Sequence, residues 1–155
     1  MSVRPSPNRS PLSAAFLVLA LGIGLAGCDK FIGNKSGTCG AGETCKCDGV
    51  GNCEQKCDGA KCKFKCAGMG NCILKCPGGK CKVTNKATGN MTLSCKKGGC
   101  KVDSSGTGNV IVDCPGGKCE LDCSGTANCQ IKNCKDGCKT NCSGQSNCSC
   151  DSGCD

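Results

Sequence analysis

CAGMGNCILKCPGGKCKVT, residues 66–84, contains within one stretch every element that recurs along this chain. Apolar and polar residues alternate at 72–76 and again at 81–84, and Gly-rich turns lie beside both segments. Alternation over about five residues, bounded by Gly, Pro and Asn, is typical of a half-buried β-strand. A helix is disfavoured because Gly recurs every few residues and no apolar stripe with helical periodicity is present. The stretch therefore predicts two strands and two turns.

The same pattern returns with a period of 19 along the chain. Full units occupy 47–65, 66–84, 85–103, 104–122 and 123–141, and a fragment follows at 142–155. A repeated unit with two strands and two turns is one coil of a β-solenoid, in which each coil packs only on its neighbours. We therefore predict an all-β protein, a single β-solenoid of about six coils, cross-linked by disulfides across its turns. At ~4.8 Å per coil, the rod is on the order of 30 Å long.

Stacking the units aligns equivalent residues into columns. Two mostly apolar columns are predicted to point inward, and they are Gln55, Leu74, Leu93, Val112 and Ile131, and Phe64, Val83, Val102, Leu121 and Thr140. A third column contains only Asn, namely Asn52, Asn71, Asn90, Asn109, Asn128 and Asn147. Amides at a repeated turn hydrogen-bond to their neighbours above and below. We expect this column to be structural.

The segment 1–28 has the organisation of an export signal. Arg4 and Arg9 precede an apolar segment, residues 14–25, that is too short to span a bilayer. The segment ends in Leu25-Ala26-Gly27-Cys28, which resembles the lipobox of bacterial lipoproteins. The alternative is an ordinary signal peptide in which Cys28 is simply the first disulfide cysteine.

The lipobox resemblance implies cleavage before Cys28 and lipid attachment to that residue. It predicts a signal peptide at 1–27, a lipidated Cys and tether at 28–38, and a Cys-rich solenoid domain at 39–155. The protein is then exported and anchored through lipid to a bacterial membrane, on the periplasmic side or at the cell surface. Asp29 resembles the inner-membrane retention signal of enteric lipoproteins, a rule that varies between bacterial groups.

A second resemblance concerns the repeats. Gly108-Asn109-Val110-Ile111-Val112 and the Gly-Asn pairs at 51–52, 70–71 and 89–90 resemble the short G-x-G-N-x-V repeats of a family of secreted or membrane-anchored bacterial proteins of unknown function. The resemblance covers roughly residues 47–148 and implies a β-solenoid, with no known activity. The cysteine content departs from it, because that pattern does not need cysteines.

The chain has 23 cysteines, and 22 remain after Cys28. Thiols oxidise outside the cytoplasm, so a disulfide framework is expected. Four units bracket the first turn with Cys at i and i+6, whereas Asn85 and Met91 replace both members in one unit, and Ser104 and Val110 replace both in another. Loss of both members together is what a covalent pair predicts, because an orphan thiol is reactive.

This comparison predicts 11 bridges, each across a turn of one coil. The first-turn pairs are Cys39-Cys45, Cys47-Cys53, Cys66-Cys72, Cys123-Cys129 and Cys142-Cys148, and the second-turn pairs are Cys57-Cys62, Cys76-Cys81, Cys95-Cys100, Cys114-Cys119, Cys134-Cys138 and Cys150-Cys154. In the twice-repeated hexapeptide CPGGKC, Pro77 suits position i+1 of a tight turn and Gly78 suits a positive φ at i+2. Bridges between stacked coils are the rival arrangement, since strands ~4.8 Å apart also lie within disulfide reach.

A metallothionein-like metal-binding thiol protein is the alternative function. The cysteine count favours it, but Cys-x-Cys occurs only at 45/47 and 148/150, Cys-x-x-Cys does not occur, and the chain has no His. The usual zinc-ribbon spacings are therefore missing. No metal site, cofactor or catalytic constellation is expected, because carboxylates are scattered and no Ser has a His base. We do not expect an enzyme.

Charge gives one indication of a partner. Residues 29–101 hold 14 lysines against five acidic residues, whereas residues 102–155 hold four against seven. The period places six lysines close together, namely Lys61, Lys63, Lys65, Lys80, Lys82 and Lys101. This cluster predicts contact with an anionic envelope polymer or with lipid headgroups, and its alternative is a role in solubility. Nucleic acid is not expected, since an exported chain with three aromatic residues offers little for base stacking.

Overall fold

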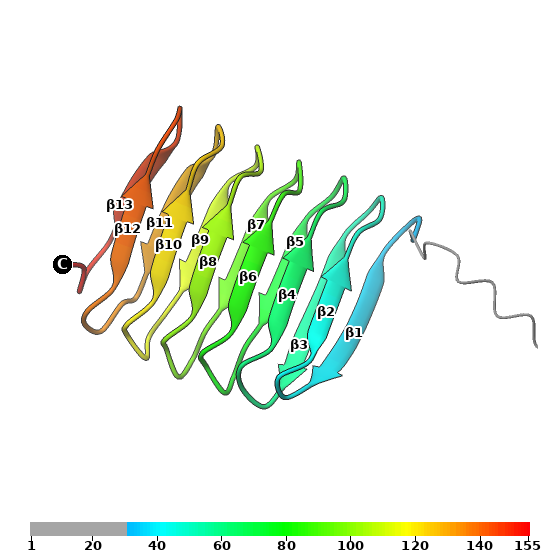
Figure 1. The fold of residues 1–155 in the computed structure, drawn as a ribbon, viewed down its shortest axis with the longest axis horizontal. Coiled ribbons are helices and arrows are strands. Elements are labelled where there is room, and N and C mark those ends of the chain that lie inside the picture. Colours follow the sequence, from blue (N-terminus) through cyan, green and yellow to red (C-terminus); the bar gives the residue numbers. More distant parts are fainter. Residues whose placement is uncertain (1–30) are drawn as a thin grey trace, which may run out of the picture.

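The alternating segments form 13 short strands in two parallel sheets (Figure 1) in a computed structural model that describes residues 31–155. One sheet has seven strands, in the order β1 (Lys35–Gly40), β3 (Cys53–Asp58), β5 (Cys72–Lys75), β7 (Met91–Ser94), β9 (Val110–Asp113), β11 (Asn128–Lys132) and β13 (Asn147–Cys150). The other has six, in the order β2 (Thr44–Cys47), β4 (Lys63–Cys66), β6 (Lys82–Asn85), β8 (Lys101–Ser104), β10 (Glu120–Cys123) and β12 (Lys139–Cys142).

The chain passes from one sheet to the other at every turn, which makes a single β-solenoid of about six coils, as predicted. Partners in the central coils lie one full repeat apart, as Leu74 pairs with Leu93 and Leu93 with Val112. Within residues 31–155 no helix forms, and so none there is long and apolar enough to cross a membrane.

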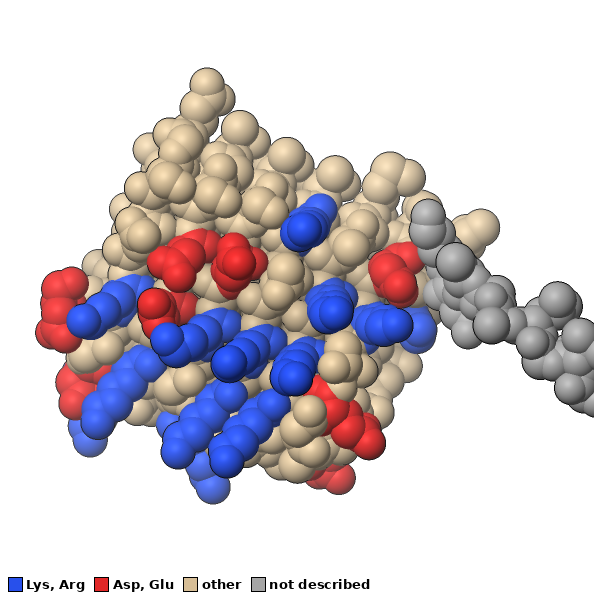
Figure 2. Space-filling model, viewed as in Figure 1, with Lys and Arg blue, Asp and Glu red and all other residues tan. Residues whose placement is uncertain are grey.

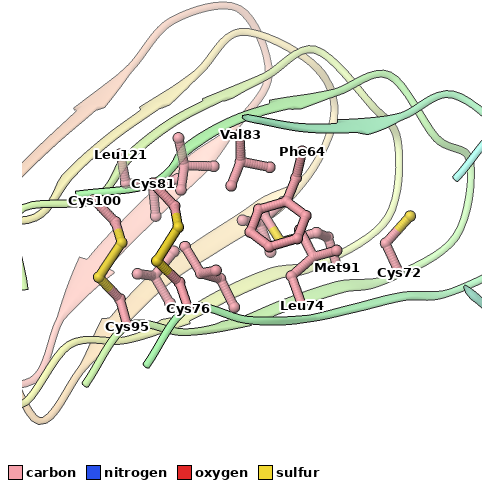
Figure 3. Packing of buried hydrophobic residues seen from close by; sticks show 14 of the residues in the cluster. Phe64, Cys72, Leu74, Cys76, Cys81, Val83, Met91, Cys95, Cys100 and Leu121 are labelled. Carbon is pink, nitrogen blue, oxygen red and sulfur yellow. A yellow bond between two sulfur atoms is a disulfide. The ribbon is translucent and has the colours of Figure 1, made fainter. Parts of the chain in front are cut away.

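The core is a thin layer between the two sheets. Both predicted inward columns lie in it, with Leu93, Val112, Leu121 and Ile131 fully buried, and only Thr140, in the last full coil, is half-buried. Figure 3 shows the stacked Cys76–Cys81 and Cys95–Cys100 bridges at one end of this layer, with Phe64, Leu74 and Met91 between them and Cys72. Disulfides thus fill core volume that larger apolar side chains occupy in other proteins.

The second turns of the three central coils are tight turns, each closed by a backbone hydrogen bond to Cys76, Cys95 or Cys114. In CPGGKC the Gly79 amide donates to the Cys76 carbonyl at 3.2 Å, and Pro77 occupies position i+1. The expectation for Gly78 was wrong, because the positive φ falls at Gly79 (72°) and Lys80 (59°). Gly78 is required for another reason: a Cβ there would lie 2.0 Å from the Gly59 carbonyl oxygen of the preceding coil.

The Asn column forms the predicted ladder at the first turn. The side-chain oxygen of Asn71 accepts a hydrogen bond from the backbone N–H of Asn90 at 2.9 Å. The side-chain oxygen of Asn90 accepts in the same way from the backbone N–H of Asn109 at 3.0 Å. Side-chain amides continue the ladder from Asn128 to Asn109 and from Asn147 to Asn128, both at 3.3 Å. The amides thus bond to one another along the rod, which is the structural role expected of them.

The solenoid begins earlier than predicted. Strand β1 starts at Lys35, and Ile32 already pairs with Val50, although residues 28–38 were predicted as a tether. The reason is a change of period, because the step from Lys35 to its partner Cys53 is shorter by one than the step from Thr44 to its partner Lys63. Alignment at a strict period of 19 therefore misses the first strand. The signal peptide and Cys28 lie outside the described residues.

Candidate functional site

Ten disulfides close turns within single coils. They are Cys39–Cys45, Cys47–Cys53, Cys57–Cys62, Cys76–Cys81, Cys95–Cys100, Cys114–Cys119, Cys123–Cys129, Cys134–Cys138, Cys142–Cys148 and Cys150–Cys154, with Cα atoms 5.7–6.7 Å apart. All ten are pairs that the repeat comparison predicts, but Cys39–Cys45 closes a second turn rather than the first turn assigned to it, because Cys39 pairs with Cys57. The rival arrangement between coils is close at hand, because the sulfurs of Cys57, Cys76 and Cys81 lie within 4.8 Å of one another.

The eleventh predicted bridge is absent, since Cys66 and Cys72 are buried free thiols. The hydrogen bond between the two thiols is the main cause that raises the pKa of Cys66, and burial raises it further. The same hydrogen bond lowers the pKa of Cys72. The turn between them is held by bonds to adjacent coils, such as Ala67 amide to Cys47 carbonyl at 2.9 Å. Spacing alone overpredicts this bridge because the first turn closes without one.

The two coils that lack first-turn cysteines show how this is achieved. Met91 and Val110 are fully buried and fill the space of one cysteine column. Asn85 and Ser104 fill the other, and the Asn85 side-chain amide donates to the Ser104 hydroxyl at 3.0 Å. In each of these coils, therefore, an apolar residue and a hydrogen-bonded polar residue together take the place of the two bridged cysteines.

In the disulfide-bonded chain, residues 31–155 offer no group of three free cysteine thiols. Five groups of three sulfurs lie within 4.8 Å, but each group contains at least one sulfur already bonded in a disulfide. Only the group of Cys47, Cys66 and Cys72 includes free thiols, and it has two. Metal ligation requires thiolates, so the oxidised chain has no set of three thiolate ligands in this range.

The six-stranded sheet carries the most concentrated charge. Lys63, Lys82 and Lys101 are register partners on β4, β6 and β8, and Lys61 and Lys80 precede the first two in the second turn. These five residues line a shallow hollow of about 520 Å³ together with Cys81 and Gly99. Figure 2 shows lysines gathered over the end of this face where the strands begin. We call these five residues the lysine face.

The predicted cluster of six lysines differs from the lysine face in one residue, Lys65, and two further lysines, Lys118 and Lys139, continue its columns. Lys65 lies on β4 but pairs with Lys46 and does not line the hollow. Lys118 occupies the turn position of Lys61 and Lys80, and Lys139 follows Glu120 in the column of Lys101. The repeat alignment contains the signal for both.

Three turn lysines adopt a backbone conformation that favours glycine. Lys61, Lys80 and Lys118 have φ of 62°, 59° and 57°, and glycine fills the same position at Gly99 and Gly137. A left-handed residue with a Cβ costs roughly 1–2 kcal/mol. The fold therefore accepts glycine at this position, and lysine is present against a local conformational cost.

The lysine face is poorly neutralised. Among the described residues the only ion pairs are Lys101 with Glu120 and Lys75 with Glu54, so Lys61, Lys63, Lys80 and Lys82 lack acidic partners there. The ion pair with Glu120 raises the pKa of Lys101, which keeps that ammonium charged. Neighbouring ammonium groups repel each other by about 1 kcal/mol at 4–5 Å in water. A polyanion laid along the columns would relieve this repulsion.

Comparisons of the chain with protein-family models, with curated proteins and with solved structures gave no match.

Proposed function

We propose that this protein is a lipid-anchored binding module of the bacterial cell envelope, whose lysine face binds a linear anionic envelope polymer. The anchor is Cys28 and the disulfide-stapled solenoid is the display scaffold. The observation that carries the proposal is the set of left-handed lysines at Lys61, Lys80 and Lys118, beside glycine in the same position of other coils. Strained backbone retained without structural need is typical of a functional position.

The alternative role of these lysines is protection of exposed strands from aggregation. The seven-stranded sheet argues against that role, since one of its outward columns, Glu54, Ile73, Thr92, Ile111 and Gln130, holds no lysine, and the other, Lys56, Lys75, Ser94, Asp113 and Lys132, mixes lysine with serine and aspartate. In that sheet lysines follow one another on no more than two neighbouring strands, whereas Lys63, Lys82 and Lys101 follow one another on three. The lysine columns need another explanation, and an anionic partner supplies one.

The geometry of the lysine face suits an extended ligand. Two parallel columns, one in the turns and one on the strands, run along the rod with a step of ~4.8 Å. Their ammonium groups are exposed, so each neutralises charge without deep desolvation. A flexible polymer with phosphate or carboxylate groups can follow such columns over several coils. The ten disulfides support an oxidising location outside the cytoplasm.

Binding to inorganic polyphosphate and to polygalacturonate, measured by calorimetry over a range of salt concentrations, tests the proposal. We expect K63Q/K82Q/K101Q to weaken binding at least about tenfold and to lower the salt slope by roughly one unit per removed contact. The matched control is K56Q/K86Q/K132Q, which removes the same charge from β3, from the first turn after β6 and from β11. Its affinity should change less than about twofold.

Three other binding results would change the proposal. Equal loss in both triple variants would show that net charge alone is responsible and would contradict a specific face. No binding of the wild-type protein to either polymer would contradict the proposed function. Binding restricted to vesicles of anionic lipid would assign the lysine face to headgroups instead.

A further inference from the structure

A short apolar strip lies at the first turn of the first three coils. Ile32, Val50 and Met69 are 91%, 46% and 61% exposed. They are consecutive partners, because Ile32 bridges to Val50 and Val50 to Met69 in parallel. Backbone hydrogen bonds fix them, as the Val50 amide donates to Phe31 and the Gly51 amide donates to Met69. We call these three residues the apolar strip.

The strip ends abruptly along the rod. The same turn position is Thr88, Thr107, Thr126 and Gln145 in the following coils, and all four are exposed. The fold therefore tolerates small polar residues at this position, so burial does not demand the apolar ones. Large exposed apolar residues that form a continuous patch mark an interaction surface rather than chance exposure.

The sequence places this strip beside the lipid attachment site. The described chain starts at Phe31, only three residues after Cys28, and three residues extend at most about 11 Å. Phe31 is itself fixed to the solenoid, since its carbonyl accepts from Val50 and its ring lies against Gly49. A lipid on Cys28 would therefore hold the first coil at the bilayer surface, with no long tether between them.

We infer that the apolar strip is a membrane-contact surface, on which the solenoid rests against the interface of the bilayer that holds its anchor. This inference rests on the lipidation of Cys28 in the proposed function. Apolar side chains of peripheral proteins enter about 5–10 Å into the headgroup and acyl boundary. The strip lies at the first turn and the lysine face begins at the second, so the strip-down orientation leaves the lysine face directed away from the lipid (Figures 1 and 2).

The chain offers an unusually clean test, because it has no Trp and no Tyr. Three variants, V50W, M69W and T107W, each place one indole in the same column, two within the strip and one beyond it. The full lipidated protein is reconstituted into vesicles of phosphatidylcholine brominated on its acyl chains. We expect at least about a twofold loss of emission for V50W and M69W relative to unbrominated vesicles, because the bromines lie at the depth that interfacial side chains reach.

The control and the opposite results are as follows. T107W should keep its emission, and M69W should lose its quenching when I32T/V50T is added, since threonine is the residue of the distal coils. Equal quenching of M69W and T107W, or none in either, would overturn the inference. Mass spectrometry of the N-terminal peptide separates the two ideas. A lipidated Cys28 with unquenched M69W refutes the membrane contact alone, whereas quenched M69W with an unmodified Cys28 refutes the anchor alone.

Discussion

Removal of the central bridge Cys95–Cys100 by C95A/C100A should destabilise the solenoid by about 3 kcal/mol. The bridge closes a loop of six residues, which corresponds to about 2 kcal/mol of loop entropy in the unfolded chain. Both cysteines are fully buried, so the lost sulfur atoms add roughly 1 kcal/mol through lost contacts and residual space. Guanidinium unfolding followed by circular dichroism, without reductant, measures the change.

The single variant C95A should form a less uniform set of disulfides than the double variant C95A/C100A. It leaves the Cys100 thiol, whose sulfur position lies within 4.8 Å of Cys76. A Cys100 thiolate that attacks Cys76 would form Cys76–Cys100 and release Cys81 as a thiolate. We therefore expect mixed bridges in C95A and a single species in C95A/C100A.

The bridge Cys150–Cys154 supplies the control. It lies in the last coil, where both cysteines are only half-buried, and its removal by C150A/C154A should cost less than about 1 kcal/mol in a rod whose end coil opens locally. The reasoning would be refuted if C95A/C100A stayed within about 0.5 kcal/mol of wild type. It would also be refuted if C95A kept all other bridges intact.

Three further predictions concern the core, the ladder and the free thiols. L93A should cost about 2–4 kcal/mol in the same unfolding assay, because Leu93 is fully buried between two coils. N90A should cost about 1 kcal/mol, since the Asn90 side chain accepts from the Asn109 amide at 3.0 Å. Iodoacetamide should label Cys72 before Cys66, because their hydrogen bond lowers the pKa of Cys72 and raises that of Cys66, and labelling should become faster as the pH rises. Fragmentation of the peptide spanning 66–75 locates the label. Preferred labelling of Cys66 would contradict this order.

The regular part of the fold follows from the sequence because each coil repeats one solution. The constant period places Leu74, Leu93 and Val112 in one buried column and aligns the Asn ladder, and both features appear in the structure. Paired absence of cysteines, at Asn85 and Met91 for example, indicates which residues share a turn. No contact outside the neighbouring coils is needed to reach these conclusions.

The departures arise where a local detail breaks the repeat. The first coil has a shorter step than the others, so the alignment misses β1 and the pairing of Ile32 with Val50. Close approach between coils, rather than a positive φ, determines Gly78. The apolar strip is invisible to periodicity alone, because only burial shows that Val50 and Met69 face outward.

The candidate site was predictable in part. The alignment brings Lys63, Lys82 and Lys101 together, and the structure shows them lining one hollow. It does not show that Lys61 and Lys80 have positive φ, since that depends on the turn geometry of CPGGKC. Backbone strain, which carries the argument for function, requires coordinates.

The most direct test of the central claim, that disulfides close turns within coils, is a tryptic peptide map of the alkylated, non-reduced protein. Trypsin cleaves after Lys75, Lys80 and Lys82, so a bridge within the coil joins residues 76–80 to residues 81–82. The account predicts this linked pair, with residues 66–75 carrying two alkyl groups on Cys66 and Cys72. A peptide that joins residues 57–61 to residues 76–80 would mean bridges between coils and would contradict the account.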